Sequence, residues 1–273
     1  FFQCFLFSTG TVSLSANSLL LSLLLHRNSN SLGNYRLLLI IFAVADIGIS
    51  ILHLWYIPMF ALFENGFIYY GYGSLFGTGL FARKSIVLFS TTFYLPFFLI
   101  AIHFLYRYLS LARPSVVREN FHRFFIFFVV YATLYHMFTA YLSNGVVTLG
   151  ISARFQGYLA EYEQRPIDSD VNVGAVEYID ANSEVNYKAI FIILAAGSVG
   201  GHANLISAVC IYKIVRVFRA HRAINIVARR VHIQLFRALL LQFSIPFFFS
   251  FVPFSAIVAL PVFGIPVGET GDL

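Results

Sequence analysis

Residues 37–60 read LLLIIFAVADIGISILHLWYIPMF, an apolar run that contains one acidic side chain, Asp46, and no lysine or arginine. A helix needs about 20 mostly apolar residues to cross a hydrocarbon core roughly 30 Å thick, so this run is long enough to span a membrane. Arg36 comes directly before it and marks one end of the span. The stretch therefore predicts a transmembrane helix.

The same pattern recurs along the chain, in runs bounded by charged residues or by clusters of Gly, Asn and Ser. Six such runs lie at about residues 3–25, 37–60, 85–105, 124–147, 189–212 and 235–263. Of all residues, 59% are hydrophobic and only 11% are charged, against roughly 25% charged in a soluble domain. A soluble fold of this length could not bury so much apolar surface. We therefore expect an all-α, polytopic helical membrane protein.

The lysines and arginines are distributed unevenly among the connections. Thirteen of the 18 lie in the connections after the first, third and fifth runs, together with a single acid, Glu119. The positive-inside rule makes these connections cytoplasmic and the N-terminus extracellular, and it accounts for the net charge of +6 without a nucleic-acid partner. Arg83 and Lys84 do not fit this topology easily, and we expect them to snorkel at the outer edge of the third span.

Polar side chains in the outer halves of the spans are candidates for a ligand site. His53 and Tyr56 share a face of the second span, and Thr91 and Tyr94 share a face of the third, because residues three apart lie on one side of a helix. His202 in the fifth span is a further candidate. We expect these residues to contact a small ligand. The alternative is an aromatic belt, with threonine hydroxyls bonded to helical carbonyls and His202 as a packing residue.

Asp46 is the clearest ionisable residue inside a span, where a charge is costly and is by default a functional candidate. Asn17 in the first span lies at a comparable depth and is its expected partner. Two interpretations stay open for Asp46, a hydrogen bond that packs helices and a conformational or ion-binding role. Pro246 and Pro253 interrupt the sixth span, so we expect a kinked helix that is the best candidate to move, with static kinking as the alternative.

Three motifs carry a family resemblance. The third span ends in HFLYRYLSLARP (residues 103–114), LGNYR (32–36) leads into the second span, and QLFRALLLQFSIP (234–246) begins the sixth. These motifs resemble the corresponding segments of nematode seven-transmembrane chemoreceptors of the Str superfamily. The acidic connection of about forty residues between the fourth and fifth spans also fits, so the resemblance covers essentially the whole chain.

The resemblance implies an olfactory-type G-protein-coupled receptor that binds a small odorant and signals through a heterotrimeric G protein at the plasma membrane of sensory-neuron cilia. It implies that Arg107 carries the switch role of the third helix. Asp46 is a further switch candidate because of its place inside a span. It also implies a seventh helix after Leu273, so we interpret residues 1–273 as a single receptor domain that stops before that helix. The expected G-protein face contains Arg113, Lys213, Arg216 and Arg219, whose alternative role is positive-inside charge that attracts anionic lipid.

Familiar enzyme signatures such as H-E-x-x-H, G-x-S-x-G and a phosphate-binding Gly-rich loop do not occur in the sequence. We therefore expect no catalytic activity, no metal and no cofactor. Two other classes stay open: a six-span small-molecule transporter or channel, and a non-signalling truncated receptor product. Transporters usually show internal repeats, and none is evident here.

Overall fold

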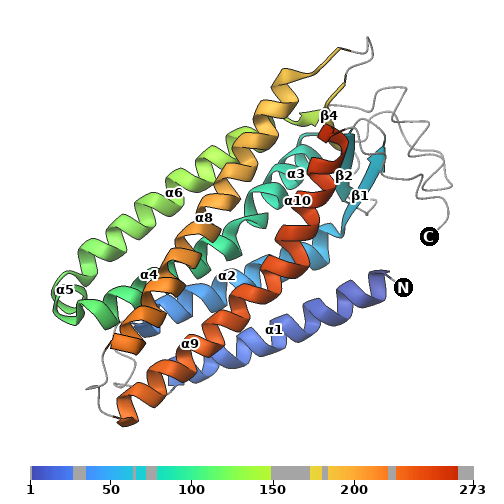
Figure 1. Ribbon diagram of the computed structural model, residues 1–273. Coiled ribbons are helices and arrows are strands. Elements are labelled where there is room, and N and C mark those ends of the chain that lie inside the picture. The colour runs from blue at the N-terminus through green and yellow to red at the C-terminus, as the bar shows by residue number, and fades with distance from the viewer. Residues whose placement is uncertain are drawn as a thin grey trace.

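The computed structural model describes residues 2–26, 35–63, 66–71, 79–148, 173–179, 184–220 and 226–263. Within these ranges long helices run side by side in a bundle, and a small β-sheet covers one end of it (Figure 1). Six helical segments are long and apolar enough to cross a membrane, as the sequence predicts. The protein is therefore an all-α polytopic membrane protein, although the small sheet was not anticipated.

The helices that form the spans follow one another up and down the bundle. The first two spans are α1 (Phe2–His26) and α2 (Tyr35–Tyr56), and the third consists of α3 (Gly79–Phe93) and α4 (Leu95–Ala112). A short helix, α5 (Pro114–Glu119), leads into the fourth span, α6 (Phe121–Asn144), and the fifth span is α8 (Tyr187–Ala220). The sixth consists of α9 (Ile226–Pro246), η1 (Phe247–Phe251), α10 (Val252–Ala259) and η2 (Leu260–Phe263).

The second span ends earlier than the apolar run suggests. α2 stops at Tyr56, and the chain continues as strand β1 (Pro58–Phe63). Pro58 has no N–H to extend the helix, and Ile57 has a positive φ of 46°, which turns the chain away from the helix axis. β1 then pairs antiparallel with β2 (Gly66–Gly71).

The two strands belong to a four-stranded antiparallel sheet in the order β1-β2-β4-β3. β3 (Val147–Thr148) follows the fourth span and β4 (Val173–Glu177) precedes the fifth. Backbone hydrogen bonds between β2 and β4 therefore join the connection after the second span to the connection after the fourth. Most of the acidic residues of the connection between the fourth and fifth spans lie outside the described residues.

The sheet is tied to the sixth span by one buried contact. Tyr178, directly after β4, donates a hydrogen bond of 2.8 Å from its hydroxyl to the carbonyl oxygen of Val258 in α10. That carbonyl lies near the end of α10, where the helix tightens into the 3₁₀ turn η2. Sheet and sixth span are thus held together at the end of the bundle opposite α5 (Figure 1).

The core is centred on α4, in which ten of the 18 residues are buried. Phe98 and Phe104 are almost fully buried there, and Ile214 of α8 and Leu239 of α9 join them in one apolar cluster. Large apolar side chains on the outward faces of the other spans are exposed, for example Ile126 with an exposed fraction of 61%. Since these faces meet lipid rather than water, their exposure is the distribution expected of a membrane bundle.

The sixth span changes its helical pattern between Pro246 and Pro253. η1 is a π-helical turn directly after Pro246, and the N–H of Val252 donates to the carbonyl of Phe247, five residues back. A π turn inserts one extra residue into the helical ladder, and such turns occur frequently at functional sites. The interruption expected from the prolines is therefore present as a local change of hydrogen-bond register.

The sheet generates a stability prediction at Gly174, which pairs directly with Tyr69 across β2 and β4. A methyl group at Gly174 would overlap the Tyr69 ring, whereas one at Gly197 in α8 would meet no atom within 4 Å. Overpacking of this kind costs about 1–3 kcal/mol, so we expect Gly174→Ala to lower the melting temperature of the purified protein in detergent by several degrees. Gly197→Ala should leave it unchanged or slightly raised. Equal melting temperatures for the two variants would contradict this packing.

Candidate functional site

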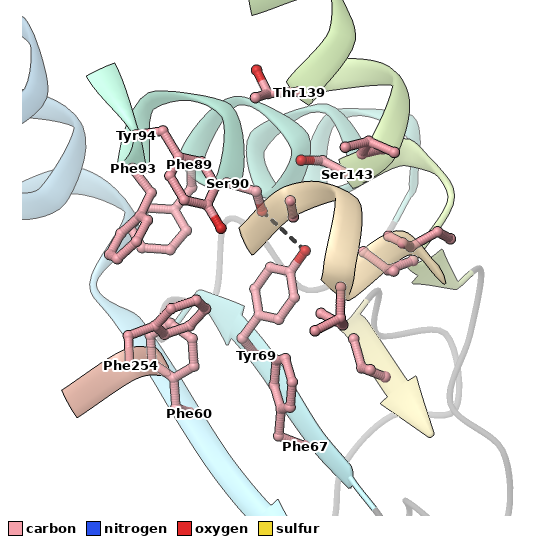
Figure 2. A pocket seen from close by; sticks show the side chains of 16 residues that line it. Phe60, Phe67, Tyr69, Phe89, Ser90, Phe93, Tyr94, Thr139, Ser143 and Phe254 are labelled. Atoms are coloured by element: carbon pink, nitrogen blue, oxygen red, sulfur yellow. Dashed lines mark hydrogen bonds between the residues drawn. The ribbon is translucent and has the colours of Figure 1, made fainter. Parts of the chain in front are cut away.

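A partly enclosed cavity of about 70 Å³ lies beneath the sheet, among the ends of the spans that meet there (Figure 2). Its wall combines the end of α3 with Tyr94 directly after it, the last turns of α6, the first turns of α8, α10 and strands β1, β2 and β4. The lining residues are Phe60, Phe67, Tyr69, Phe89, Ser90, Phe93, Tyr94, Thr139, Leu142, Ser143, Val146, Val176, Ile192, Ile193, Ala196 and Phe254. The sheet therefore acts as a lid that completes the cavity.

Aromatic rings form much of the wall, and Phe254 contacts several of them. Its ring centroid lies 4.9 Å from that of Phe93, 6.0 Å from that of Phe60 and 6.4 Å from that of Phe67. Phe93 belongs to the third span, while Phe60 and Phe67 belong to the sheet. One side chain of the sixth span thus touches both the lid and the third span at the cavity (Figure 2).

Hydroxyl groups supply the polar part of the cavity. The Ser90 hydroxyl is 2.9 Å from the Tyr69 hydroxyl and 2.8 Å from the carbonyl oxygen of Ile86. Since Ser90 carries one hydroxyl proton and a carbonyl only accepts, Tyr69 donates to Ser90 whenever Ser90 donates to Ile86. The Tyr94 hydroxyl is directed into the cavity (Figure 2), and it forms no hydrogen bond with any residue that the structure describes. Tyr94 is therefore free to bond a ligand.

The chemistry of the wall restricts what the cavity holds. The lining residues that the structure describes include no Asp, Glu, His, Lys or Arg. An unpaired charge in apolar surroundings is costly, so the site suits an uncharged molecule with one polar group. The cavity is smaller than the roughly 150 Å³ that holds a benzene ring in another protein. A ligand of more than a few heavy atoms therefore requires the surrounding rings to move.

Three of the five residues predicted to bind ligand lie at this cavity or next to it. Tyr94 lines it. Tyr56 is fully buried and stacks on Phe89, a lining ring, with centroids 4.9 Å apart. His53 approaches the same ring at 5.4 Å. Tyr56 and His53 thus support the wall of the cavity from α2 rather than lining it.

The other two predicted residues lie elsewhere. Thr91 donates a hydrogen bond of 2.7 Å to the carbonyl of Val87 and lines a separate open groove between α3 and α6. His202 lies in the middle of α8, where its Nε2 forms a hydrogen bond with the hydroxyl of Tyr131 in α6. Both side chains are thus engaged within or between helices, and neither lines the cavity under the sheet.

Sequence reasoning missed the contribution of the sheet and did not single out Phe254 in the sixth span. Phe60 was placed in the second span rather than in a strand, Phe67 and Tyr69 come from a connection for which no strand was predicted, and Phe254 is one phenylalanine among many in its span. One signal for the hairpin was available, because Asn65-Gly66 between two apolar runs is a strong predictor of a tight turn between strands.

Arg107 lies at the opposite end of the bundle, in a buried cluster of aromatic residues. Its guanidinium carbon is 4.4 Å from the centre of the Tyr35 ring, and its side chain is only 7% exposed. The Tyr35 hydroxyl is 3.3 Å from Nδ1 of His103, and the Tyr35 ring stacks on Tyr106 at 5.5 Å. Nε and Nη2 of Arg107 have no hydrogen-bond partner in the part of the chain that is described. A cation–π contact, rather than an ion pair, therefore holds this cation.

The other basic residues predicted at the G-protein face are exposed at the same end of the bundle. Arg113 joins α4 to α5, and Lys213, Arg216 and Arg219 follow one another along the last turns of α8. The Lys213 ammonium lies 5.2 Å from the centre of the Tyr108 ring, which belongs to α4. These cations and Arg107 thus occupy the end of the bundle marked by α5 (Figure 1).

The expected contact between Asp46 and Asn17 is not formed. The Asn17 side chain donates 3.1 Å to the carbonyl of Ser13 in its own helix, an alternative that short polar side chains often adopt. α1 and α2 are joined instead by a hydrogen bond of 2.7 Å between Ser13 and Ser50. Asp46 is half-buried and forms no hydrogen bond with the residues whose positions are described.

Comparison with known proteins adds one match. A family model described as "Serpentine type 7TM GPCR chemoreceptor Str" matches residues 2–273. No curated protein matches the chain. The matched region contains the cavity, the sheet and Arg107.

The lid generates a prediction for alkaline pH. Burial beneath the sheet raises the pKa of Tyr69 to about 12, although its hydrogen bond with Ser90 opposes this shift. Because the folded state then binds the phenol proton more tightly than the unfolded state, the resulting stability is present below pH 10 and is lost as the pH rises through about 12. We expect the melting temperature of the wild type to fall more steeply than that of Tyr69→Phe over this interval.

The matched control for this pH series is Tyr187→Phe, which removes the hydroxyl of a tyrosine that is 78% exposed. Its melting temperature should follow that of the wild type at every pH. A Tyr69→Phe series that runs parallel to the wild type would show that the Tyr69 phenol does not titrate in a buried state.

Proposed function

The chain belongs to the Str family of serpentine seven-transmembrane chemoreceptors, and from this we propose that it binds a small, uncharged, weakly polar molecule and signals to a heterotrimeric G protein. We further propose that it acts at the plasma membrane, in the cilia of sensory neurons. The observation that carries the proposal is the aromatic cavity beneath the sheet, because a side chain of the interrupted sixth span forms part of its wall.

A ligand activates a receptor only if it binds one conformation better than another. A molecule in the cavity would contact Phe254 of the sixth span and Tyr94 of the third. The size of the bound molecule would therefore affect the distance between these two spans. Its polar group would bond the Tyr94 hydroxyl or the Tyr69–Ser90 pair. Occupancy thus favours the arrangement in which the rings make room for it.

A continuous series of ring contacts runs from the cavity toward the Arg107 cluster, along the interface of the third and sixth spans. Its successive pairs, with centroid distances, are Phe254–Phe93 (4.9 Å), Phe93–Phe97 (6.3 Å), Phe97–Phe251 (5.6 Å), Phe251–Phe247 (5.7 Å), Phe247–Phe243 (5.3 Å) and Phe243–Phe104 (5.9 Å). Phe104 lies one helical turn from Arg107 in α4. The series passes through the π turn, which is the element best suited to adopt two hydrogen-bond registers.

The Arg107 cluster is suited to carry the conformational change to the G protein. Among the described residues no acid pairs with this buried guanidinium, two of its nitrogens have no hydrogen-bond partner, and the Tyr35 ring holds it by a cation–π contact. Separation of the sixth span from α4 would free this cation to meet a polar partner. Lys213, Arg216 and Arg219 on α8 would then flank the same opening and contact the G protein.

The transporter or channel alternative predicts a different experiment. It requires substrate flux in vesicles that contain no G protein, and loss of that flux on Asp46→Asn. Asp46 does not line the cavity, and no charged residue among the described lining does. The receptor proposal is therefore the better supported of the two.

The first test of the proposal fills the cavity. We expect a panel of small uncharged alcohols, ketones and aromatics to contain agonists that activate a G-protein dissociation sensor in cells expressing the chain. Ala196→Phe should abolish those responses at equal surface expression, because Ala196 lines a cavity with little spare room. Ala208→Phe, at an exposed position of the same helix, is the control and should respond normally. Agonist potency unchanged by Ala196→Phe would place the ligand elsewhere.

The second test concerns the contact between Arg107 and Tyr35. Tyr35→Ala removes the ring that holds the cation, a contact worth roughly 0.5–2 kcal/mol, so basal signalling should rise by about 2- to 30-fold. Tyr35→Phe keeps the ring and should keep basal signalling near the wild type, whereas Arg107→Ala should abolish signalling while surface expression stays intact. Basal activity that is the same in Tyr35→Ala and the wild type at equal expression would rule out this restraint.

A further inference from the structure

A second, larger hollow lies on the outer surface of the bundle, between α3 and α6. It is an open groove of about 720 Å³ near the sheet, separate from the cavity described above. Leu80, Leu88 and Met137 along it are all strongly exposed, with exposed fractions of 66%, 49% and 66%. In a membrane bundle such a groove faces lipid.

One end of the groove is cationic. Nη2 of Arg83 in α3 donates a hydrogen bond of 3.0 Å to Oδ1 of Asn144 in α6, which holds the guanidinium between the two helices. Lys84 is exposed and forms no ion pair with any residue that the structure describes. No acidic residue lines the groove within the part of the chain that the structure describes. Two positive charges are therefore available there to an anionic partner.

The remainder of the groove presents an apolar surface. Thr91, Thr92 and His136 are the polar residues in it, and each bonds a carbonyl oxygen four residues back in its own helix, at 2.7, 2.9 and 2.7 Å. With both threonine hydroxyls and Nδ1 of His136 bonded, the groove offers mainly the methyl and methylene groups of Val87 and Ala140 and their neighbours.

The depth of the cationic end follows from helix geometry. Arg83 and Arg107 are 24 residues apart in one span, Leu80–Ala112, which corresponds to about 36 Å at 1.5 Å per residue. The hydrocarbon core is roughly 30 Å thick. When Arg107 lies at one membrane interface, Arg83 and Lys84 therefore lie at the level of the lipid head groups at the other, and the groove extends from them into the hydrocarbon.

We propose that this groove binds an anionic phospholipid of the surrounding membrane, with its phosphate against Arg83 and Lys84 and one acyl chain along Leu88, Met137 and Ala140. A guanidinium matches the geometry of a phosphate, and an ammonium adds a mobile second charge. The groove volume falls within the range of roughly 300–1,000 Å³ that is typical of binding sites for small, mostly apolar molecules. The proposal also gives a reason for two basic residues at the end of the bundle that the positive-inside rule leaves poor in them.

The test compares head groups on the purified full chain in detergent. Native mass spectrometry would count bound lipids during titration with phosphatidylglycerol or with phosphatidylcholine of the same acyl chains. The wild type should prefer phosphatidylglycerol. Each basic residue near an anionic lipid contributes about fivefold in affinity, so Arg83→Gln/Lys84→Gln should weaken phosphatidylglycerol binding by about 25-fold.

The matched control is Arg118→Gln/Arg123→Gln, which removes the same charge from exposed positions at the opposite end of the bundle. Its phosphatidylglycerol affinity should stay within about twofold of the wild type, since its charges lie more than a Debye length of about 8 Å from the groove. Equal losses in the two double variants, or a wild type without preference for phosphatidylglycerol, would overturn the proposal.

A further pair of variants tests the acyl-chain part. Ala140→Trp fills the groove with both charges intact and should reduce lipid retention, whereas Leu194→Trp on the exposed face of α8 should not. Met137→Trp is the substitute if Ala140→Trp lowers the melting temperature. Undiminished lipid binding by a folded groove-filling variant would overturn the proposal, because the chain would then lie outside the groove.

Discussion

The need to satisfy every backbone N–H and C=O without water is the constraint on which this structure depends. Inside hydrocarbon only a helix or a closed sheet satisfies these groups, so six apolar runs become six helices. Where the helical ladder is interrupted, at the π turn after Pro246, the turn still lies in the span and Phe251 packs its ring against Phe97 of α4. Outside the hydrocarbon, backbone N–H and C=O groups of two connections bond one another in the sheet.

The small sheet forms a lid over the cavity at one end of the helix bundle. Its strands come from two connections, and its residues Phe67 and Tyr69 face the third and sixth spans. The bond from Tyr178 to Val258 fixes the lid to the helix that carries Phe254. Lid, cavity and sixth span are therefore mechanically connected, and the position of one affects the other two.

Much of the fold can be predicted from the sequence, because a long apolar run in a membrane has few alternatives to forming a helix. The sheet does not follow as readily, since the pairing of Gly66 with Glu177 joins residues far apart in sequence and depends on how the spans assemble. Tyr94 could be proposed from helical spacing, but Phe254 is indistinguishable by sequence from other phenylalanines of its span. Arg107 was identifiable from its motif, whereas its partner Tyr35 was not, because a cation–π contact leaves no pattern of opposite charges.

The pairing of β2 with β4 also imposes an order on biosynthesis. Tyr69 leaves the ribosome well before Gly174, its partner in the sheet, which lies about 105 residues later. At roughly 5–20 residues per second, the β1–β2 hairpin waits about 5–20 s with one edge unpaired while the third and fourth spans are inserted. The cavity therefore cannot close during insertion of the first half of the chain, and its wall is complete only after Phe254 of the sixth span has been made.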